Sequence, residues 1–239
     1  MEQRETLWPG GLQLIYDGDC FPPSTDSFLL AAFPRLRRDM AVCDLGAGTG
    51  LLGLLLLGRE PTLTVTGVEL QEHACRLLRR TAEENGLTER LVCCPGDLRD
   101  KALLPTGRFH LVLSNPPYFP PESGALPPET ARRLARSEGC SPEELCAAAS
   151  RLLRWGGSFC LVHRPERLVE LVEALRRHRL EPKRLRFVQH SAAAAPSLLL
   201  LDSRLGGHPG LQVEPPLLLT GPDGRETEEV RRIYFKDKE

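Results

Sequence analysis

The stretch Asp44-Leu45-Gly46-Ala47-Gly48-Thr49-Gly50 decides the fold of this 239-residue chain. It joins the apolar run at 41–43 to the leucine-rich run at 51–57, which predicts a tight turn from a buried strand into a buried helix. Its glycines follow a G-x-G-x-G spacing, whereas dinucleotide folds use G-x-G-x-x-G, and an aspartate comes first. A carboxylate there would repel a pyrophosphate but suits a cofactor with an ammonium and a sulfonium, which predicts S-adenosylmethionine. The alternative is an ordinary tight connection, because a glycine-rich turn alone is not specific.

Strand-like and helix-like stretches alternate along the chain. This alternation implies a parallel sheet with right-handed crossovers. The capping box Ser141–Glu144, with proline at the first helical position, begins one helix, and Asn85-Gly86 ends another in the left-handed conformation. The pattern predicts an α/β fold with a doubly wound, seven-stranded, mostly parallel Rossmann-like sheet. Strands are expected at 41–43, 63–68, 91–94, 109–114, 158–162, 186–189 and 197–201, and helices at 27–33, 51–57, 71–84, 142–153 and 166–178.

The tetrapeptide Asn115-Pro116-Pro117-Tyr118 follows directly on the strand-like run at 109–114. Proline lacks an N–H donor, so the turn can present two acceptors, the Asn115 side-chain oxygen and the Pro116 carbonyl. Two acceptors suit a planar NH₂ group whose lone pair is delocalised, because hydrogen bonds to both protons help to localise that pair. The Tyr118 ring can stack on a flat substrate, a contact worth about 1 to 3 kcal/mol per base. The tetrapeptide therefore predicts chemistry at an amino group.

These two motifs together resemble the class I S-adenosylmethionine-dependent methyltransferases that modify amino groups, in which Asn/Asp-Pro-Pro-Tyr/Phe/Trp is the catalytic loop. The likeness extends to the bacterial tRNA(Val) adenine 6-amino methyltransferase family and covers the chain from Gly10 to Tyr234. It is carried further by the leader at 21–31, by Ala135–Glu138 and by His163–Leu168. The resemblance implies an N-terminal leader at 1–39 that packs over the cofactor site and a methyltransferase domain at 40–239.

Several acidic side chains are expected to hold the cofactor. Glu69 ends the second strand, where a carboxylate can accept both ribose hydroxyls, although a solvated strand end is the alternative. By resemblance Asp97 accepts from the adenine amino group, or it caps a turn. Thr25 and Asp26 match the leader, and both are also good N-caps for the helix at 27–33. The predicted cofactor-binding residues are Thr25, Asp26, Asp44, Gly46, Ala47, Gly48, Gly50, Glu69, Leu70, Asp97, Leu98 and Asn115, and the predicted catalytic residues are Asn115, Pro116, Pro117 and Tyr118.

Charge does not select the substrate. With 41% hydrophobic and 26% charged residues the composition is typical of a globular chain, and the net charge of -1 gives no global attraction to nucleic acid. Binding to RNA would need a local basic patch. Arginine clusters are usually solvated faces, which is the alternative for each. The candidates are Arg132, Arg133 and Arg136 after the catalytic turn, and Arg176, Arg177, Arg179, Lys183, Arg184 and Arg186 near the C-terminus.

No metal is expected, because the eight cysteines form no Cys-x-x-Cys pair and are interpreted as free, buried thiols. His163, at a strand end, is expected to be structural. The N-terminus lacks a signal-peptide pattern, and the run at 51–57 is too short to span a bilayer. A cytoplasmic location, without membrane association, is therefore expected.

The resemblance implies methylation of the 6-amino group of an adenine in tRNA, in the anticodon loop. A protein-glutamine amide methyltransferase is the first alternative, but that family adds a helical domain before the glycine turn, and here 43 residues precede Asp44. A DNA adenine methyltransferase would normally carry a target-recognition domain. A non-catalytic RNA-binding protein on the same fold is the remaining alternative, against which the intact tetrapeptide argues.

Overall fold

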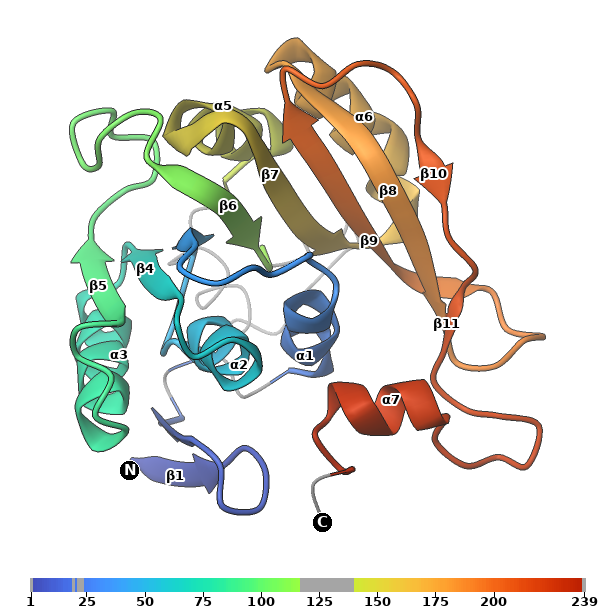
Figure 1. Cartoon of the computed structure of the whole chain (residues 1–239), viewed down its shortest axis with the longest axis horizontal. Helices are drawn as coiled ribbons and strands as arrows, with labels where there is room; N and C mark the ends of the chain where they lie inside the picture. The colour runs from blue at the N-terminus through green and yellow to red at the C-terminus, as the bar shows by residue number, and fades with distance from the viewer. Residues whose placement is uncertain (1, 19, 21–23, 117–139, 238–239) are drawn as a thin grey trace, which may run out of the picture.

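The structure is a computed structural model that describes residues 2–18, 20, 24–116 and 140–237. Its strands are β1 (Gln3–Thr6), β2 (Gln13–Tyr16), β3 (Ala41–Leu45), β4 (Thr64–Glu69), β5 (Leu91–Pro95), β6 (Phe109–Ser114), β7 (Leu153–His163), β8 (Leu180–Gln189), β9 (Pro196–Leu205), β10 (Gln212–Val213) and β11 (Leu217–Leu218). Within the described part, a nine-stranded sheet runs in the order β10-β8-β9-β7-β6-β3-β4-β5, with β11 also paired to β8 (Figure 1).

The predicted sheet is confirmed. Strands β3, β4, β5, β6 and β7 pair in parallel, and β9 is antiparallel to both β7 and β8. The seven expected strands are β3 to β9. The hairpin of β1 and β2 and the short strands β10 and β11 were not predicted, because two to four residues are too few to show a period of two.

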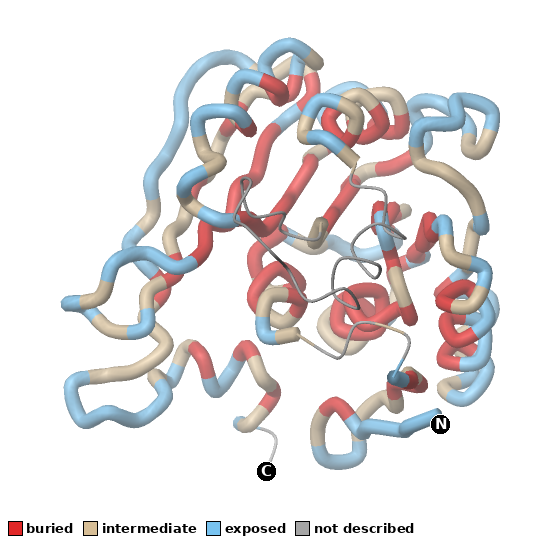
Figure 2. Tube along the Cα trace, turned by 180° about the vertical axis from the view of Figure 1, so that it is seen from behind, coloured by how far each residue is buried: buried red, intermediate tan, exposed pale blue. Residues whose placement is uncertain are grey.

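Helices cover both faces of the sheet. They are α1 (Thr25–Ala32), α2 (Leu51–Arg59), α3 (Glu72–Glu84), α5 (Pro142–Leu152), α6 (Leu168–Arg177) and α7 (Glu228–Ile233), with a short 3₁₀ turn at Pro165–Arg167. Successive strand residues alternate between the two faces: Val42 packs in the core under α1, α2 and α7, whereas Cys43 packs in the core under α5 and α6. The central strands and the inner helix faces are accordingly buried, whereas β1, β10 and many of the connections are exposed (Figure 2).

The glycine turn depends on its glycines at specific positions. Gly46, Gly48 and Gly50 have φ angles of 81°, 55° and 92°, which side chains with a Cβ rarely adopt. The backbone N–H groups of Gly46 and Ala47 both donate to the Val68 carbonyl, at 2.9 and 3.0 Å. The turn is therefore folded back against the end of β4.

Several element boundaries differ from the sequence prediction, among them the start of β8, which lies at Leu180 and not at residue 186. Helix α1 begins at Thr25 with Ser24 as its N-cap, so Thr25 and Asp26 lie inside the first turn and do not cap it. Strand β7 begins at Leu153, because Gly156 at φ 74° allows an irregular stretch that shifts the register against β6. The left-handed residue after α3 is Gly86, since Asn85 has a φ of -96°.

The hairpin of β1 and β2 is fixed against α3. The Ile15 N–H donates to Thr81 Oγ1 at 3.1 Å, and the Asn85 side chain exchanges two hydrogen bonds with the Gln13 backbone, at 2.8 and 2.7 Å. These side chains are polar groups on a helix face that meets an edge strand, so they satisfy backbone groups that the short hairpin leaves unpaired. Strand β2 is therefore held at a defined place beside the last turn of α3.

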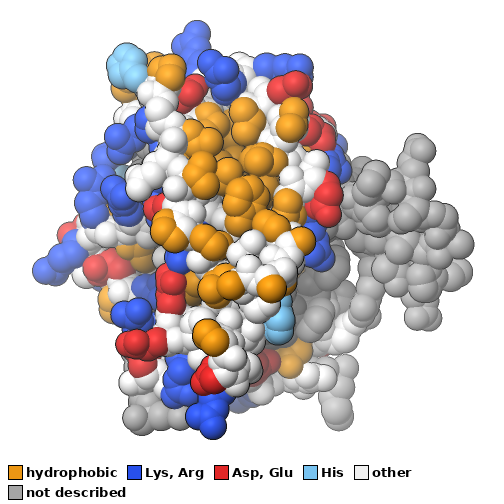
Figure 3. All heavy atoms as spheres, turned by 90° about the vertical axis from the view of Figure 1, so that its right-hand side faces the viewer, with side chains coloured by type: hydrophobic (Ala, Val, Ile, Leu, Met, Phe, Trp, Pro, Cys, Tyr) orange, Lys and Arg blue, Asp and Glu red, His pale blue; other side chains and the backbone are white. Residues whose placement is uncertain are grey.

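Hydrophobic side chains gather on the face shown in Figure 3, which is the side on which β8 and β10 lie in Figure 1. Leu211 and Val213 are exposed near that edge.

None of the helices in the described ranges combines the length and the apolar character that crossing a membrane requires.

Candidate active site

Two buried carboxylates lie where β3 and β4 end beside the glycine turn. Asp44 is 2% exposed, and burial together with the Glu69 charge raises the pKa of Asp44 to about 7. Glu69 is 7% exposed and is held by the backbone: its Oε2 accepts from Gly48 N and its Oε1 from Gln71 N, both at 2.8 Å. Since two buried negative charges repel, the pair favours a bound cation.

The donor set at this turn fits S-adenosylmethionine. A sulfonium or ammonium near Asp44 would supply a positive charge to a carboxyl group whose pKa is raised by burial and by the neighbouring Glu69 charge. Each Glu69 oxygen accepts one backbone hydrogen bond and has a second acceptor position for a ribose hydroxyl. Leu70, the next residue, is 50% exposed and offers an apolar surface that a flat adenine ring could cover.

Asp97 has structural partners at the position where the adenine contact was predicted. Its carboxylate accepts from the Arg99 backbone N–H at 2.9 Å and makes a bidentate pair with the Arg99 guanidinium. Hydrogen bonds from Arg99 accordingly lower the pKa of Asp97. The alternative of a turn-capping aspartate is thus seen in the structure, and contact with the adenine stays a prediction for Asp97 and for half-buried Leu98.

Asn115 follows β6 and is oriented by helix α1. Its Nδ2 donates to Ser27 Oγ at 3.1 Å and to Ser24 Oγ at 3.4 Å. Because the amide oxygen and nitrogen diverge from one carbon, these bonds direct Oδ1 away from the serines. One residue earlier, Ser114 Oγ donates to the Leu45 carbonyl at 2.8 Å, which ties the end of β6 to the glycine turn. The amide and the two carboxylates are thus part of one site.

The amino-acid sequence alone does not show that Ser24 and Ser27 hold the Asn115 amide. Both lie in the leader that carries part of the resemblance, but the hydroxyl-to-amide contact spans 88 residues from Ser27 to Asn115. A serine near a helix start predicts a cap, and no residue pattern distinguishes a cap from a support for a distant amide. Only the docking of α1 beside β6 shows the contact.

The second half of the catalytic tetrapeptide lies outside the described residues. Pro116 is half-buried and lines a small pocket with His163, Arg167 and Pro142. Pro117 and Tyr118 are not described, and neither are Arg132, Arg133 and Arg136. Their predicted roles stay predictions.

His163 is a buried, neutral side chain beside this pocket. Burial, with the nearby Arg167 charge, lowers the pKa of His163 to about 4, and its Nδ1 accepts from the Arg164 N–H at 2.8 Å. An imidazole in this state cannot act as a general acid near neutral pH. Its placement agrees with the structural role expected from the sequence.

The model of the family described as methyltransferase small domain matches residues 24–178, which include α1, the glycine turn and Asn115. The chain belongs to this family. Curated relatives agree with the assignment: one from Porphyromonas gingivalis (strain ATCC 33277) is 33% identical over 75% of this chain and 73% of its own length, and one from Cronobacter sakazakii is 33% identical over 88% and 85%. Both are named tRNA1(Val) (adenine(37)-N6)-methyltransferase.

Solved structures support the fold. A predicted O-methyltransferase from Agrobacterium tumefaciens has a TM-score of 0.74 at 23% identity and covers 88% of this chain and 96% of its own. Geranyl diphosphate C-methyltransferase from Streptomyces coelicolor, solved with S-adenosyl-L-homocysteine, has a TM-score of 0.55 at 13% identity and covers 75% and 78%. At these identities the likeness concerns the fold alone. The predicted family resemblance, the class I fold and the activity of an N-methyltransferase are confirmed.

Two of the C-terminal arginines form ion pairs within the methyltransferase. This corrects the part of the sequence prediction that listed them as candidates for RNA binding. Arg184 and Arg186 have side chains only 13% and 18% exposed, and they pair with Glu214 at 2.7 Å and Glu229 at 2.6 Å. A guanidinium enclosed by carboxylates is not available to a phosphate. Arg176, Arg177, Arg179 and Lys183 lie nearer the surface, and Arg176 and Arg177 also face carboxylates.

The cysteine prediction is partly wrong. All eight thiols are free, but only Cys43, Cys75, Cys146 and Cys160 are buried, and the other four are half-buried. Burial raises the pKa of Cys93 and of Cys140 to about 12, so both are protonated near neutral pH. Cys93 and Cys94 lie in β5, the edge strand of the sheet, and Cys20 and Cys140 lie in connections, so an apolar run does not imply full burial at these positions.

An open groove of about 590 Å³ lies beside the start of helix α1. Ser24 lines this groove and also accepts a hydrogen bond from Asn115 Nδ2, so the groove and Asn115 share one neighbour. Its walls carry Trp8, Phe28 and Tyr234, with the Phe28 and Tyr234 rings 5.1 Å apart. Aromatic rings in an open groove are typical surfaces for nucleobases.

Proposed function

We propose that this methyltransferase transfers a methyl group from S-adenosylmethionine to the 6-amino group of an adenine in tRNA. The relatives named above support the substrate class. The observation that carries the proposal is Asn115, whose Nδ2 is held by Ser24 and Ser27 so that its Oδ1 turns to the other side. An acceptor held in this way at the end of β6 suits an amino group with two protons to donate.

In this proposal the residues of the site bind the cofactor and the adenine and align the reacting groups. Asp44, Glu69 and the glycine turn would hold S-adenosylmethionine, which supplies a methyl group already activated on its sulfonium. Asn115 Oδ1 and the Pro116 carbonyl would accept the two protons of the adenine amine and localise its lone pair. The excess proton on the methylated amine can leave to water, so neutral His163 is not required as a base. Alignment of amine, methyl and sulfur then carries most of the rate.

An unpaired adenine is expected to be a better substrate than an adenine in a duplex. Extruding a base from a duplex costs a few kcal/mol, whereas an anticodon loop already presents unstacked bases. The proposed target is the adenosine directly 3′ of the anticodon, and the names of the relatives give adenine 37 of tRNA1(Val). Tyr118 is proposed to stack on the target base, and the aromatic groove beside α1 gives a neighbouring base a place to lie. Residues 1–39 would serve as the leader over the cofactor, which the contact of Ser24 and Ser27 with Asn115 supports.

Transfer of a labelled methyl group tests the proposal. Purified enzyme and labelled S-adenosylmethionine are incubated with unmodified tRNA, an anticodon stem-loop, duplex DNA and a glutamine-containing peptide. The expected product is N6-methyladenosine in the tRNA, identified by mass spectrometry of digested nucleosides. Label in the peptide and none in RNA would support the protein-glutamine alternative, and cofactor binding without transfer to any substrate would support the non-catalytic one.

A further inference from the structure

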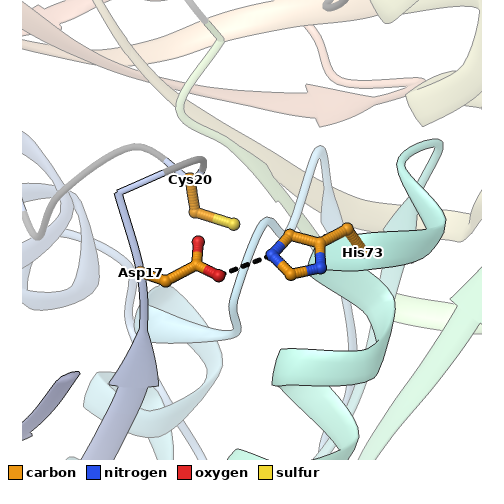
Figure 4. A group of neighbouring side chains, drawn as sticks. All are labelled: Asp17, Cys20 and His73. Carbon is orange, nitrogen blue, oxygen red and sulfur yellow. Dashed lines mark hydrogen bonds and ion pairs between the residues drawn. The ribbon is translucent and has the colours of Figure 1, made fainter. Parts of the chain in front are cut away.

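Three side chains of metal-ligating type meet between the leader and helix α3. Asp17 follows β2, Cys20 lies in the next turn, and His73 is in the first turn of α3 (Figure 4). One ligand atom from each residue lies within 4.8 Å of the other two, and His73 Nε2 is 2.7 Å from Asp17 Oδ2. The sulfur, nitrogen and oxygen atoms therefore face a common space.

The surrounding structure fixes the positions of these ligands. The bonds from Thr81 and Asn85 to the backbone of β2 hold Asp17 beside α3, on which His73 is carried. The Cys20 N–H donates to the Asp17 carbonyl at 3.2 Å, which closes a turn and brings the thiol back over the carboxylate. Ligands on a helix and at a strand end are placed more accurately than ligands on a long loop.

We propose that Asp17, Cys20 and His73 form a Zn²⁺ site. A thiolate, an imidazole and a carboxylate are the three ligand types that Zn²⁺ takes in proteins, and three protein ligands leave the fourth tetrahedral position for water. The thiolate and the carboxylate together balance the charge of the ion. Mg²⁺ prefers oxygen ligands in octahedral geometry, so this set selects against it. The ion would join the leader to the helix that follows Glu69.

Coordination requires two proton movements. The Cys20 thiol loses its proton to solvent, because the thiolate is the ligand. The His73 ring must turn its Nε2 lone pair to the ion and carry its proton on Nδ1 instead. Arg76 opposes this, since its guanidinium lies 3.0 Å from Nδ1 and can only donate there. The Arg76 side chain is 56% exposed and can move aside, so its removal should strengthen metal binding.

The test is a titration of the full-length protein with Zn²⁺ and Co²⁺ in the presence of a reductant that does not bind metals. One Zn²⁺ per chain is expected to bind, and bound Co²⁺ should show the near-ultraviolet charge-transfer band of a cobalt–thiolate bond. Cys20→Ser should abolish that band, and Cys20→Ser and His73→Gln should each weaken Zn²⁺ binding by at least about 10-fold. Arg76→Ala should tighten it, and Mg²⁺ should not compete.

Cys140→Ser is the matched control, because Cys140 is also half-buried but lies outside the cluster. This variant should bind Zn²⁺ and show the cobalt band as the parent does. Thermal unfolding without metal checks that each variant is folded. No Zn²⁺ binding by the parent, or equal binding by folded Cys20→Ser, would overturn the proposal, as would a cobalt band that disappears in Cys140→Ser.

Discussion

At the scale of single residues, the Asn115 side-chain amide is proposed to hold the reacting amine. Asn115→Ala should lower kcat by at least about 100-fold, the typical loss when one preorganised hydrogen-bonding partner of a reacting group is removed. Binding of S-adenosylmethionine should change little, because Asp44 and Glu69 are expected to supply its polar contacts. Asn115→Asp keeps an acceptor oxygen and should retain part of the turnover. Single-turnover methylation of tRNA and cofactor calorimetry measure the two effects separately, and an Asn115→Ala enzyme as fast as the parent would refute the assignment.

Asp44 gives the site a dependence on pH. Its pKa of about 7 in the native state lies above the ordinary value, so its protonated form stabilises the fold at low pH and this contribution is lost as pH rises through 7. Asp44→Asn cannot ionise. We therefore expect the unfolding free energy of the parent, relative to this variant, to fall between about pH 5 and pH 8 in the absence of cofactor. Denaturant titrations at both pH values measure the difference.

The cofactor should reverse this trend. A sulfonium or ammonium stabilises ionised Asp44, so S-adenosylmethionine should bind the parent more tightly as pH rises through 7, whereas Asp44→Asn should show a flatter and weaker affinity. Calorimetry over the same pH range gives the comparison. Equal pH profiles for parent and variant would show that the Asp44 carboxylate does not face the cofactor's positive charge.

At the scale of helices and strands, the sequence identified the elements with a clear period or a clear turn. The glycine turn predicted the β3–α2 connection, and the capping box predicted the start of α5, where Ser141 and Glu144 exchange both expected hydrogen bonds. The boundaries were less predictable. Helix α1 starts at Thr25 because Ser24 takes the extended cap conformation, although Asp26 has the same capping propensity as a serine.

Helix α1 is part of the core and is also proposed to support the turn that begins at Asn115. Leu29 and Leu30 are buried on one side of it, while Ser27 and Ser24 reach Asn115 on another. Ser27→Ala should lower kcat by roughly 5- to 30-fold, since about 1 to 2 kcal/mol is typical for one lost hydrogen bond of this kind. Its KM for S-adenosylmethionine should stay unchanged. Ser27→Thr, which keeps the hydroxyl, should recover much of the rate, and Ser150→Ala, near the end of α5 and just before the start of β7, serves as the control.

At the scale of the whole molecule, the site is assembled from segments that are far apart in the chain. Asp44, Glu69 and Asn115 could be predicted because parallel strands bring their carboxyl ends to one edge. The groove beside α1 could not, since it joins Trp8 to Tyr234 across nearly the full length of the chain. Nor could the burial of Arg184, because a run of arginines does not show which of them face carboxylates.

The distribution of charge over the molecule leads to the last prediction. With a net charge of -1, binding to tRNA must rest on a few arginines near the catalytic turn. Arg164 is exposed at the end of β7, next to the pocket formed by Pro116 and His163, and its guanidinium donates to the Ser197 carbonyl at 3.1 Å. Arg38 is also exposed but precedes β3, at the opposite edge of the parallel strands.

Arg164→Ala should therefore weaken tRNA binding and reduce the slope of log K against log salt by about 0.7 to 0.9, the change expected for one lost phosphate contact. Arg38→Ala should leave both quantities unchanged, since an arginine at the far edge cannot reach a tRNA whose adenine lies at Asn115. Both variants should bind S-adenosylmethionine as the parent does. Filter binding of tRNA over a range of salt concentrations gives the slopes. If Arg38→Ala lowered the slope and Arg164→Ala did not, the tRNA would have to approach from the opposite edge of the sheet, which is incompatible with transfer at Asn115.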